Sequence, residues 1–278
     1  MITSTGNNRI RAVSALVKKA KARREQKLFI AEGPKLFSEL PRTHLRETYV
    51  SESFLKLRAE RADALLKGCS YEIVSDEVMR YLSDTQTPQG ILAVAEQFSY
   101  TLSDLTAEPA HLLILETLQD PGNLGTLIRA AEGAGATGIV MNTETADIYN
   151  PKVIRSAMGS VFRMPFVYVK DLRETLLTLK KSGICLYAAH LKGSAAYDSA
   201  DYTKSAGFLI GNEAGGLTDE TAALADKAVR IPMEGRVESL NAAVAASVLM
   251  FEAARQRRSG SGVPLNIVPV SGPCRDNI

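Results

Sequence analysis

The 278-residue sequence contains no tryptophan and only three cysteines, Cys69, Cys185 and Cys274. The cysteines are far apart, with neither a CxxC pair nor a nearby pair of histidines, so we expect neither a disulfide framework nor a zinc cluster. No apolar run approaches the roughly 18 residues that a membrane-spanning helix needs, and residues 1–9 contain no apolar signal core. Together these absences predict a cytoplasmic protein without a metal site.

The remaining composition is that of an ordinary globular protein. Apolar residues make up 45% and charged residues 23% of the chain, which excludes a disordered, collagen-like or coiled-coil protein. Aromatic residues make up only 6%, so a platform on which unpaired bases stack is poorly supplied. If the chain binds nucleic acid, we expect contacts to its shape and its phosphates to dominate.

Positive charge is concentrated near the N-terminus. The net charge of the chain is only +2, yet residues 1–30 hold eight basic side chains and a single acidic one. Such a patch can follow a polyphosphate backbone, and the candidates for these contacts are Lys18, Lys19, Arg23 and Arg24. A solvated surface helix would have the same composition, so both interpretations stay open.

The pattern of apolar residues changes near residue 100 and indicates two domains. Residues 1–100 predict a smaller α/β domain, and the polar segment 99–110 predicts a linker. Residues 108–258 alternate short apolar runs with helical stretches, which predicts an α/β domain with a parallel sheet covered on both faces. The remaining residues, 259–278, contain three Ser, three Gly and three Pro, and we expect a flexible tail.

The elements of the second domain can be placed along the chain. The predicted strands are Leu112–Leu115, Gly138–Met141, Cys185–Ala189, Phe208–Ile210 and Val229–Ile231. The predicted helices cover about 124–134, 151–160, 171–182, 218–226 and 240–257. Since ligands of parallel sheets bind beyond the carboxyl ends of the strands, the polar and glycine-rich segments that follow these strands are the candidate sites.

One glycine-rich segment has the letters of a dinucleotide-binding motif but not its context. Residues 133–138 read Gly-Ala-Gly-Ala-Thr-Gly and match the pattern G-x-G-x-x-G. That pattern supports a nicotinamide or flavin site only where it follows a strand and opens a helix. Here the helical run 126–132 comes before the glycines and the strand 139–141 comes after them. We therefore predict a helix end and a tight turn, which disfavours a Rossmann oxidoreductase.

The first two candidate clusters follow the strands that end near residues 115 and 210. In the first, Asn123 is a suitable N-cap for the helix behind it, and Arg129 lies almost two turns further on. The alternative is a capped helix with a surface arginine. In the second, residues 211–217, three glycines let the backbone approach a ligand, and Glu213 places a carboxylate at the sheet edge. The alternative is a loop whose glycines only permit a turn.

The third cluster, residues 231–241, leads into a helix that is apolar nearly all round. This composition predicts that the helix is buried in a core or in a subunit contact. Ser239 fits as its N-cap. Asn241, in the first turn, either satisfies local backbone groups or faces a ligand.

In this order and spacing, the three clusters resemble the three motifs of the SpoU (TrmH) family of the SPOUT superfamily. The matching residues are Asn123 through Arg129, Gly211-Asn212-Glu213 with Gly216, and Ile231-Pro232-Met233 with Ser239-Leu240-Asn241. The first hundred residues also resemble the substrate-binding domain of the family, through Phe29-Ile30-Ala31-Glu32-Gly33 and Thr87-Pro88-Gln89-Gly90.

The resemblance implies an enzyme that transfers a methyl group from S-adenosylmethionine to a ribose 2′-hydroxyl in structured RNA, most often ribosomal RNA. It also implies a homodimer whose catalytic domain ends in a deep trefoil knot. The implied cofactor-binding residues are Gly211, Asn212, Gly216, Ile231, Met233 and Leu240. The implied catalytic residues are Asn123, Arg129, Glu213, Ser239 and Asn241. A catalytically inactive RNA-binding or assembly protein of the same fold is the main alternative.

Overall fold

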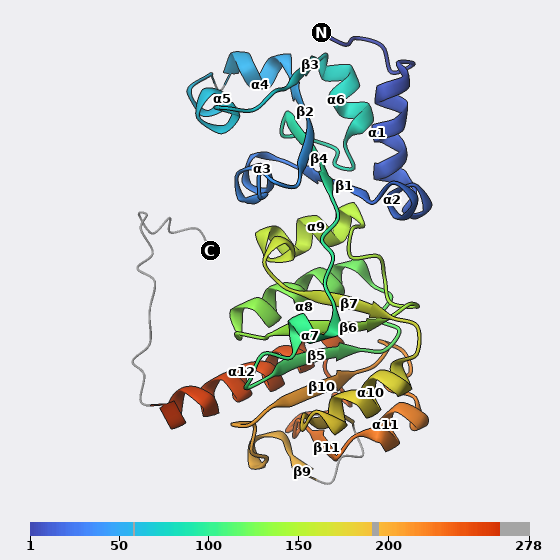
Figure 1. Ribbon diagram of the computed structural model, residues 1–278, viewed down its shortest axis with the longest axis vertical. Coiled ribbons are helices and arrows are strands. Elements are labelled where there is room, and N and C mark those ends of the chain that lie inside the picture. Colours follow the sequence, from blue (N-terminus) through green and yellow to red (C-terminus); the bar gives the residue numbers. More distant parts are fainter. Residues whose placement is uncertain (58, 191–194, 262–278) are drawn as a thin grey trace.

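The computed structural model describes residues 1–57, 59–190 and 195–261, which form two β-sheets in succession along the chain (Figure 1). The last helix, α12 (Ala242–Ser261), continues to residue 261, so the first residues of the expected tail are helical. The rest of that tail, 262–278, lies outside the described residues. No helix in the described part of the chain is both long and apolar enough to span a membrane.

The N-terminal unit is a four-stranded mixed sheet in the order β1-β4-β2-β3. Its strands are β1 (Leu28–Glu32), β2 (Leu45–Ser51), β3 (Glu72–Val74) and β4 (Ile91–Glu96). Its helices are α1 (Asn8–Lys18), α2 (Ala20–Gln26), α3 (Pro34–Glu39), α4 (Glu52–Leu57), α5 (Ala59–Leu66) and α6 (Asp76–Leu82). Apolar side chains of α1 and α6 cover one face, and those of α3, α4 and α5 cover the other.

The second unit is a seven-stranded sheet, and its parallel arrangement confirms the fold class predicted from the sequence. The strand order is β7-β6-β5-β10-β8-β11-β9. The strands are β5 (His111–Leu115), β6 (Gly138–Asn142), β7 (Phe166–Val169), β8 (Cys185–Ala189), β9 (Ala195–Ala196), β10 (Ala206–Ile210) and β11 (Lys227–Arg230). The sequence pattern missed the two edge strands, β7 and β9. The predicted knot stays a prediction.

Helices cover both faces of this sheet (Figure 1). They are α7 (Leu102–Leu105), α8 (Pro121–Gly133), α9 (Pro151–Ala157), α10 (Leu172–Lys181), α11 (Asp219–Leu224) and α12, with 3₁₀ turns at Met158–Phe162 and Tyr197–Ser199. Successive residues of β5 point to opposite faces. Leu113 and Leu115 therefore pack with α8, α9 and α12, whereas Leu112 and Ile114 pack with α7 and α10.

Two connecting segments show how local sequence sets the chain path. The expected linker contains α7, and its Leu105 is fully buried against the second sheet, so the linker is a packed element rather than a free connection. The glycine-rich segment after α8 is the predicted turn between a helix and a strand. There Gly135 has φ +72°, a conformation that glycine adopts without strain.

Candidate active site

A cavity of about 460 Å³ lies at the carboxyl edge of the parallel sheet. Its wall consists of the loop after β10, the segment after β11 and the first turns of α12, with Ala189 and His190 at the end of β8. Eight of the predicted site residues line it: Gly211, Asn212, Glu213, Gly216, Ile231, Met233, Ser239 and Leu240. Segments far apart in the sequence thus meet where parallel sheets bind ligands.

The loop after β10 turns back on itself so tightly that only glycine fits at its first position. The backbones of Asn212 and Gly216 exchange two hydrogen bonds of 3.0 and 2.9 Å. A Cβ atom on Gly211 would lie 2.0 Å from the carbonyl carbon of Gly216, well inside van der Waals contact. The side-chain amide of Asn212 donates to the carbonyl oxygen of Thr117 at 2.9 Å, which fastens the loop to the end of β5.

The segment after β11 supplies backbone groups to the cavity. Among the described residues, no backbone hydrogen bond engages residues 231–240, and the next one begins α12, from Ala245 N to Asn241 O. Ile231, Met233 and Leu240 line the cavity within this segment. Most residues of this segment are exposed, so its N–H and C=O groups can bind either solvent or a polar ligand.

A chain of hydrogen bonds joins the three sequence clusters beside the cavity. The Asn123 side-chain nitrogen donates to the Glu213 carboxylate at 3.1 Å, and the Asn241 side-chain nitrogen donates to the Asn123 side-chain oxygen at 3.1 Å. Glu213 also accepts from the backbone N–H groups of Asp120 and Gln119, at 3.1 and 3.4 Å. Glu213 therefore braces the loop before α8 and Asn123 rather than Arg129.

The Glu213 carboxylate is held in its charged form. Partial burial acts to raise its pKa, but the hydrogen bonds from the Asn123 side chain and from the loop N–H groups outweigh burial and lower the pKa below its ordinary value. A carboxylate that stays ionised at neutral pH keeps Asn123 oriented by accepting from its side-chain nitrogen.

Both predicted helix caps are wrong by a few residues. The N-cap of α8 is Asp120, whose carboxylate accepts from the backbone N–H of Asn123 at 2.7 Å, so Asn123 lies inside the first turn. The cap of α12 is Asn241, whose side-chain oxygen accepts from Ala243 N at 2.9 Å, whereas Ser239 precedes the helix and lines the cavity. The side chains of Asn123 and Ser239 are therefore free to face the site.

Arg129 is the one predicted catalytic residue that the chain does not bring to the others. It lies on the exposed face of α8, outside the lining of the cavity, and no hydrogen bond or ion pair joins its side chain to another described residue. One turn further along the same face, a Cβ atom on Gly133 would lie 3.4 Å from the Phe251 ring. Phe251 is 45% exposed on α12, so an uncovered apolar side chain lies about one turn along α8 from Arg129.

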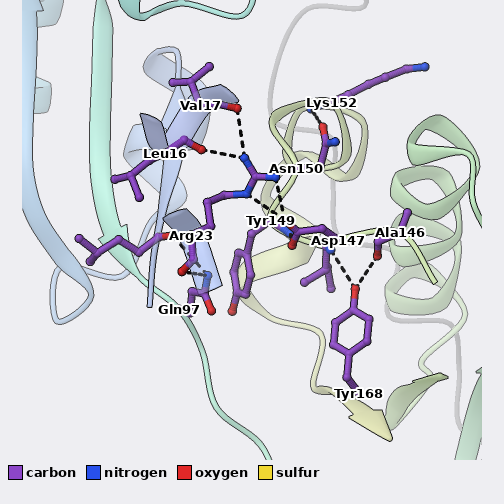
Figure 2. Close-up of polar contacts among 12 residues, drawn as sticks. Leu16, Val17, Arg23, Gln97, Ala146, Asp147, Tyr149, Asn150, Lys152 and Tyr168 are labelled. Carbon is purple, nitrogen blue, oxygen red and sulfur yellow. Dashed lines mark hydrogen bonds and ion pairs between the residues drawn. The ribbon is translucent and has the colours of Figure 1, made fainter. Parts of the chain in front are cut away.

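The basic N-terminal segment forms two helices, and one of its arginines points inward (Figure 2). The Arg23 guanidinium pairs with Asp147 at 2.7 Å and donates to the carbonyl oxygens of Leu16 and Val17. The Arg23 side chain is 4% exposed. Its prediction as an RNA contact is therefore corrected: it joins the two units. Lys18, Lys19 and Arg24 remain at the surface.

The sequence pattern missed two residues at this edge of the sheet. His190 follows β8 and lines the cavity, a position that the rule for parallel sheets already indicated. Asp120 caps α8 and lies 3.8 Å from the Lys152 amine. Within residues 1–57, 59–190 and 195–261, no group of three or more His, Cys, Asp or Glu side chains is placed to hold a metal ion.

Comparison with known proteins identifies the family. Residues 110–251 match the SpoU rRNA Methylase family, and residues 7–93 match an MRM3-like substrate binding domain. The chain is 32% identical over 250 residues to the 23S rRNA (guanosine(2553)-2′-O)-methyltransferase RlmP of Bacillus subtilis, covering 90% of this chain and 97% of that protein.

Solved structures agree with the sequence matches. The SpoU methyltransferase AviRb from Streptomyces viridochromogenes, in complex with AdoMet (S-adenosylmethionine), superposes with a TM-score of 0.82 at 29% identity, covering 91% of this chain and 99% of that one. The AdoMet-bound rRNA methyltransferase from Sinorhizobium meliloti superposes with a TM-score of 0.78 at 33% identity, covering 91% and 97%.

The fold is thus that of SpoU methyltransferases. The chain belongs to the SpoU rRNA methylase family, as its motifs predicted. The predicted activity, methylation of a ribose 2′-hydroxyl in RNA with S-adenosylmethionine as the cofactor, is confirmed with it.

Proposed function

We propose that this chain methylates a ribose 2′-hydroxyl of ribosomal RNA in the cytoplasm, with the cofactor in the 460 Å³ cavity and the RNA at its polar rim. The observation that carries the proposal is the hydrogen-bonded chain Glu213–Asn123–Asn241, which brings three distant segments to the edge of that cavity. The relatives named above act on 23S rRNA, and the N-terminal match to a substrate binding domain supports the same class of substrate.

The residues present fit S-adenosylmethionine. The cavity has the size of a small-molecule site, and Ile210, Leu217 and Leu249 give it buried apolar walls against which a purine ring can pack. Gly211 leaves the loop backbone close to the ligand, and the unpaired backbone of residues 231–240 offers donors and acceptors. Asn212 and Gly216 hold the loop in this shape.

The reaction needs placement and removal of one proton. When bound, the cofactor supplies a methyl group on a positively charged sulfur, which is already a good leaving group. The ribose oxygen must approach this methyl in line while it loses its proton. Ser239 and Asn241 orient the hydroxyl or the neighbouring phosphate, and Glu213 fixes Asn123 through its hydrogen bond.

Arg129 has two possible roles in proton removal. The pKa of a guanidinium lies above about 12, so a neutral guanidine is scarce at pH 7. In the first role, a substrate phosphate in contact with Arg129 helps to carry the proton away. In the second, Arg129 holds that phosphate and stabilises the charge that develops on the ribose oxygen. Both roles require its charge beside the substrate.

Arg129 and the uncovered face of α12 support a homodimer. Val244 is 48% exposed and Phe251 is 45% exposed on this helix. Arg129 lies on α8 one turn before Gly133, which is close to the Phe251 ring. A second copy of the chain would cover these apolar side chains and bring Arg129 next to the partner's cavity. Phe251→Glu should convert the dimer to a monomer in sedimentation analysis. If unaltered protein sediments as a monomer at micromolar concentration, this part of the proposal is wrong.

Transfer of tritium from labelled S-adenosylmethionine to unmodified 23S rRNA tests the proposed activity. Mapping of 2′-O-methyl groups in RNA from a deletion strain then identifies the nucleotide. Binding of the cofactor without transfer to any RNA would favour the inactive RNA-binding alternative. Calorimetric binding of NAD in place of S-adenosylmethionine would favour an oxidoreductase. No metal requirement is expected, and chelation should leave turnover unchanged.

The basic surface of α1 and α2 should add affinity for RNA. Neutralising Lys18, Lys19 and Arg24 together should weaken RNA binding and reduce its dependence on salt concentration, because fewer counterions are released from the phosphates. Arg23→Gln is the matched control, since its guanidinium is buried in the ion pair with Asp147. It should lower stability while the salt dependence stays the same. An unchanged salt dependence in the triple variant would show that this surface does not contact RNA and is an ordinary solvated helix surface.

A further inference from the structure

A second cavity, of about 380 Å³, lies between the N-terminal unit and α9. The N-terminal unit contributes the end of β1, the start of α3 and the loop before β4, which together contain both segments that resemble the substrate-binding domain. From the other unit, α9 contributes Arg155, and Met158 follows it. Figure 1 shows α9 between the N-terminal sheet and α8.

Arg155 enters this cavity with one donor group unused. Its Nη2 atom pairs with Asp84 at 2.7 Å, but its Nη1 atom is buried without a hydrogen-bond partner among the described residues. A buried charged donor without a partner costs free energy. Where the protein supplies no acceptor, such a group is usually paired with a ligand or with solvent. The unpaired group therefore points to an acceptor that this chain does not provide.

The other side chains of the cavity are of three kinds: a carboxylate, exposed polar groups and apolar groups. Glu32 is already occupied, because its carboxylate accepts from the hydroxyl of Thr85 at 2.9 Å and from that of Ser83 at 2.5 Å. Lys35 and Gln89 are exposed, and no hydrogen bond or ion pair engages their side chains within the described part of the chain. Leu36 and Met158 add apolar surface. The cavity thus combines cations, an amide and apolar walls.

Helix α9 connects this cavity to the candidate active site. Lys152 lies three residues before Arg155 and four residues before Ser156, so it neighbours both on the surface of the helix. The Ser156 hydroxyl donates to the Gly122 carbonyl oxygen at 3.2 Å, and Lys152 lies 3.8 Å from Asp120. Both partners belong to the N-terminal end of α8, one turn from Asn123. A single RNA strand that passes along α9 can therefore reach both places.

We propose that this second cavity binds an unpaired nucleotide of the RNA substrate, near the nucleotide that is methylated; the proposal rests on the proposed function. Sequence-specific recognition of RNA favours unstacked bases, which are held by hydrogen bonds to their edges and by packing on guanidinium or apolar surfaces. Gln89 meets the base edge, Arg155 and Met158 pack against the base, and Lys35 meets the phosphate. The Arg155 side chain is 31% exposed, and its Nη1 atom gains an acceptor from the nucleotide once the guanidinium turns toward the base.

Steady-state methyl transfer to an unmodified 23S rRNA transcript tests this assignment. Arg155→Met should raise the KM for RNA at least tenfold, while the Kd for S-adenosylmethionine stays within twofold. Asp84→Asn is the matched control, because it removes the same ion pair and leaves the guanidinium in place. Its KM should stay within threefold of the unaltered protein.

Two exposed variants keep the test independent of folding. Lys35→Gln should lower the salt dependence of RNA binding by about one phosphate contact, and Gln89→Ala should weaken binding without changing that dependence. The proposal is overturned if Asp84→Asn raises the KM as much as Arg155→Met, because Arg155 then only joins the two units. It is also overturned if all three lining variants bind the RNA as the unaltered protein does. Failure of the proposed function would appear as no methyl transfer by the unaltered protein, and the binding comparison would still decide the role of this cavity.

Discussion

Polar side chains gather at both edges of the seven-stranded sheet, but they are hydrogen-bonded differently. At the amino edge, the Arg257 guanidinium donates to the carbonyl oxygens of Pro109, Ala110, Tyr202 and Lys204. At the carboxyl edge, the backbone of residues 231–240 forms no backbone hydrogen bond with the described residues. Arg129, on the exposed face of α8, has no side-chain partner among the described residues either. Residue type alone therefore does not identify a functional site. An arginine whose donors are satisfied by the chain stabilises the fold, whereas one with unused donors is available to a substrate.

The largest effect is expected at Arg129. Arg129→Ala should lower turnover on RNA by about a hundredfold to ten-thousandfold, the range of a lost general acid, base or electrostatic stabiliser. The affinity for S-adenosylmethionine should not change, because Arg129 lies outside the cavity. Single-turnover methylation and calorimetry separate the two quantities. Turnover equal to that of the unaltered protein would remove Arg129 from the site.

Gly211→Ala should abolish detectable binding of the cofactor. The added Cβ atom would overlap the backbone of Gly216, so the loop must open and the cavity must change shape. Gly235→Ala is the matched control in the neighbouring segment, where an added Cβ atom meets nothing within 4 Å. Calorimetry with S-adenosylmethionine should show binding to the control and none to Gly211→Ala. Equal affinities would show that the loop does not form the cofactor site.

The strands of the sheet and the loops at its carboxyl edge were predictable from the sequence for different reasons. Continuous apolar runs indicated β5, β6, β8 and β10, because strands buried on both faces carry few polar residues. The edge strand β7 was missed although its four residues, Phe-Val-Tyr-Val, are all apolar or aromatic, because so short a run gives a weak periodic signal. The glycine and asparagine clusters of the carboxyl edge were predicted, because ligand-binding loops need those residue types at fixed spacing.

Contacts between distant segments could not be predicted from the sequence. Asp120 and Asn123, like Ser239 and Asn241, are both suitable caps, and spacing alone cannot choose between them. Arg23 and Arg24 are neighbours in one basic run, yet only Arg23 meets Asp147, which lies 124 residues further along the chain. Burial of a charge is decided by such a partner and leaves no local pattern.

At the amino edge, His111 should make stability depend on pH. Burial, with the nearby charge of Arg257, lowers the pKa of this imidazole to about 4. In the unfolded chain its pKa is about 6.5, so between these values the unfolded state binds the proton and the folded state does not. The free energy of unfolding should therefore fall by roughly 3 kcal/mol through this group as the pH drops from 7 to 4.

Urea denaturation at several pH values measures this contribution. His111→Gln cannot titrate, so the acid-induced loss of stability should be smaller in this variant by about the same 3 kcal/mol. The carboxylates titrate in both proteins, so their contributions to the pH dependence of stability cancel in the difference. Parallel loss of stability in the two proteins would mean that the buried imidazole accepts a proton without penalty.

The smallest effect, at Arg257, sharpens the contrast with Arg129 most directly. Burial lowers the pKa of Arg257, but its guanidinium donates hydrogen bonds to four backbone carbonyl oxygens, which stabilise its charged form. Arg257→Met retains the apolar stem and removes the donor groups from those carbonyl oxygens, of which only that of Ala110 keeps another donor among the described residues, Ala206 N. The free energy of unfolding should therefore fall by about 2 kcal/mol. Turnover per folded molecule should be unchanged. Arg255→Met, on the same helix but in a solvent-exposed pair with Glu252, should leave stability almost unchanged. If Arg257→Met instead lost turnover at full stability, hydrogen-bond satisfaction would not distinguish structural from functional arginines in this fold.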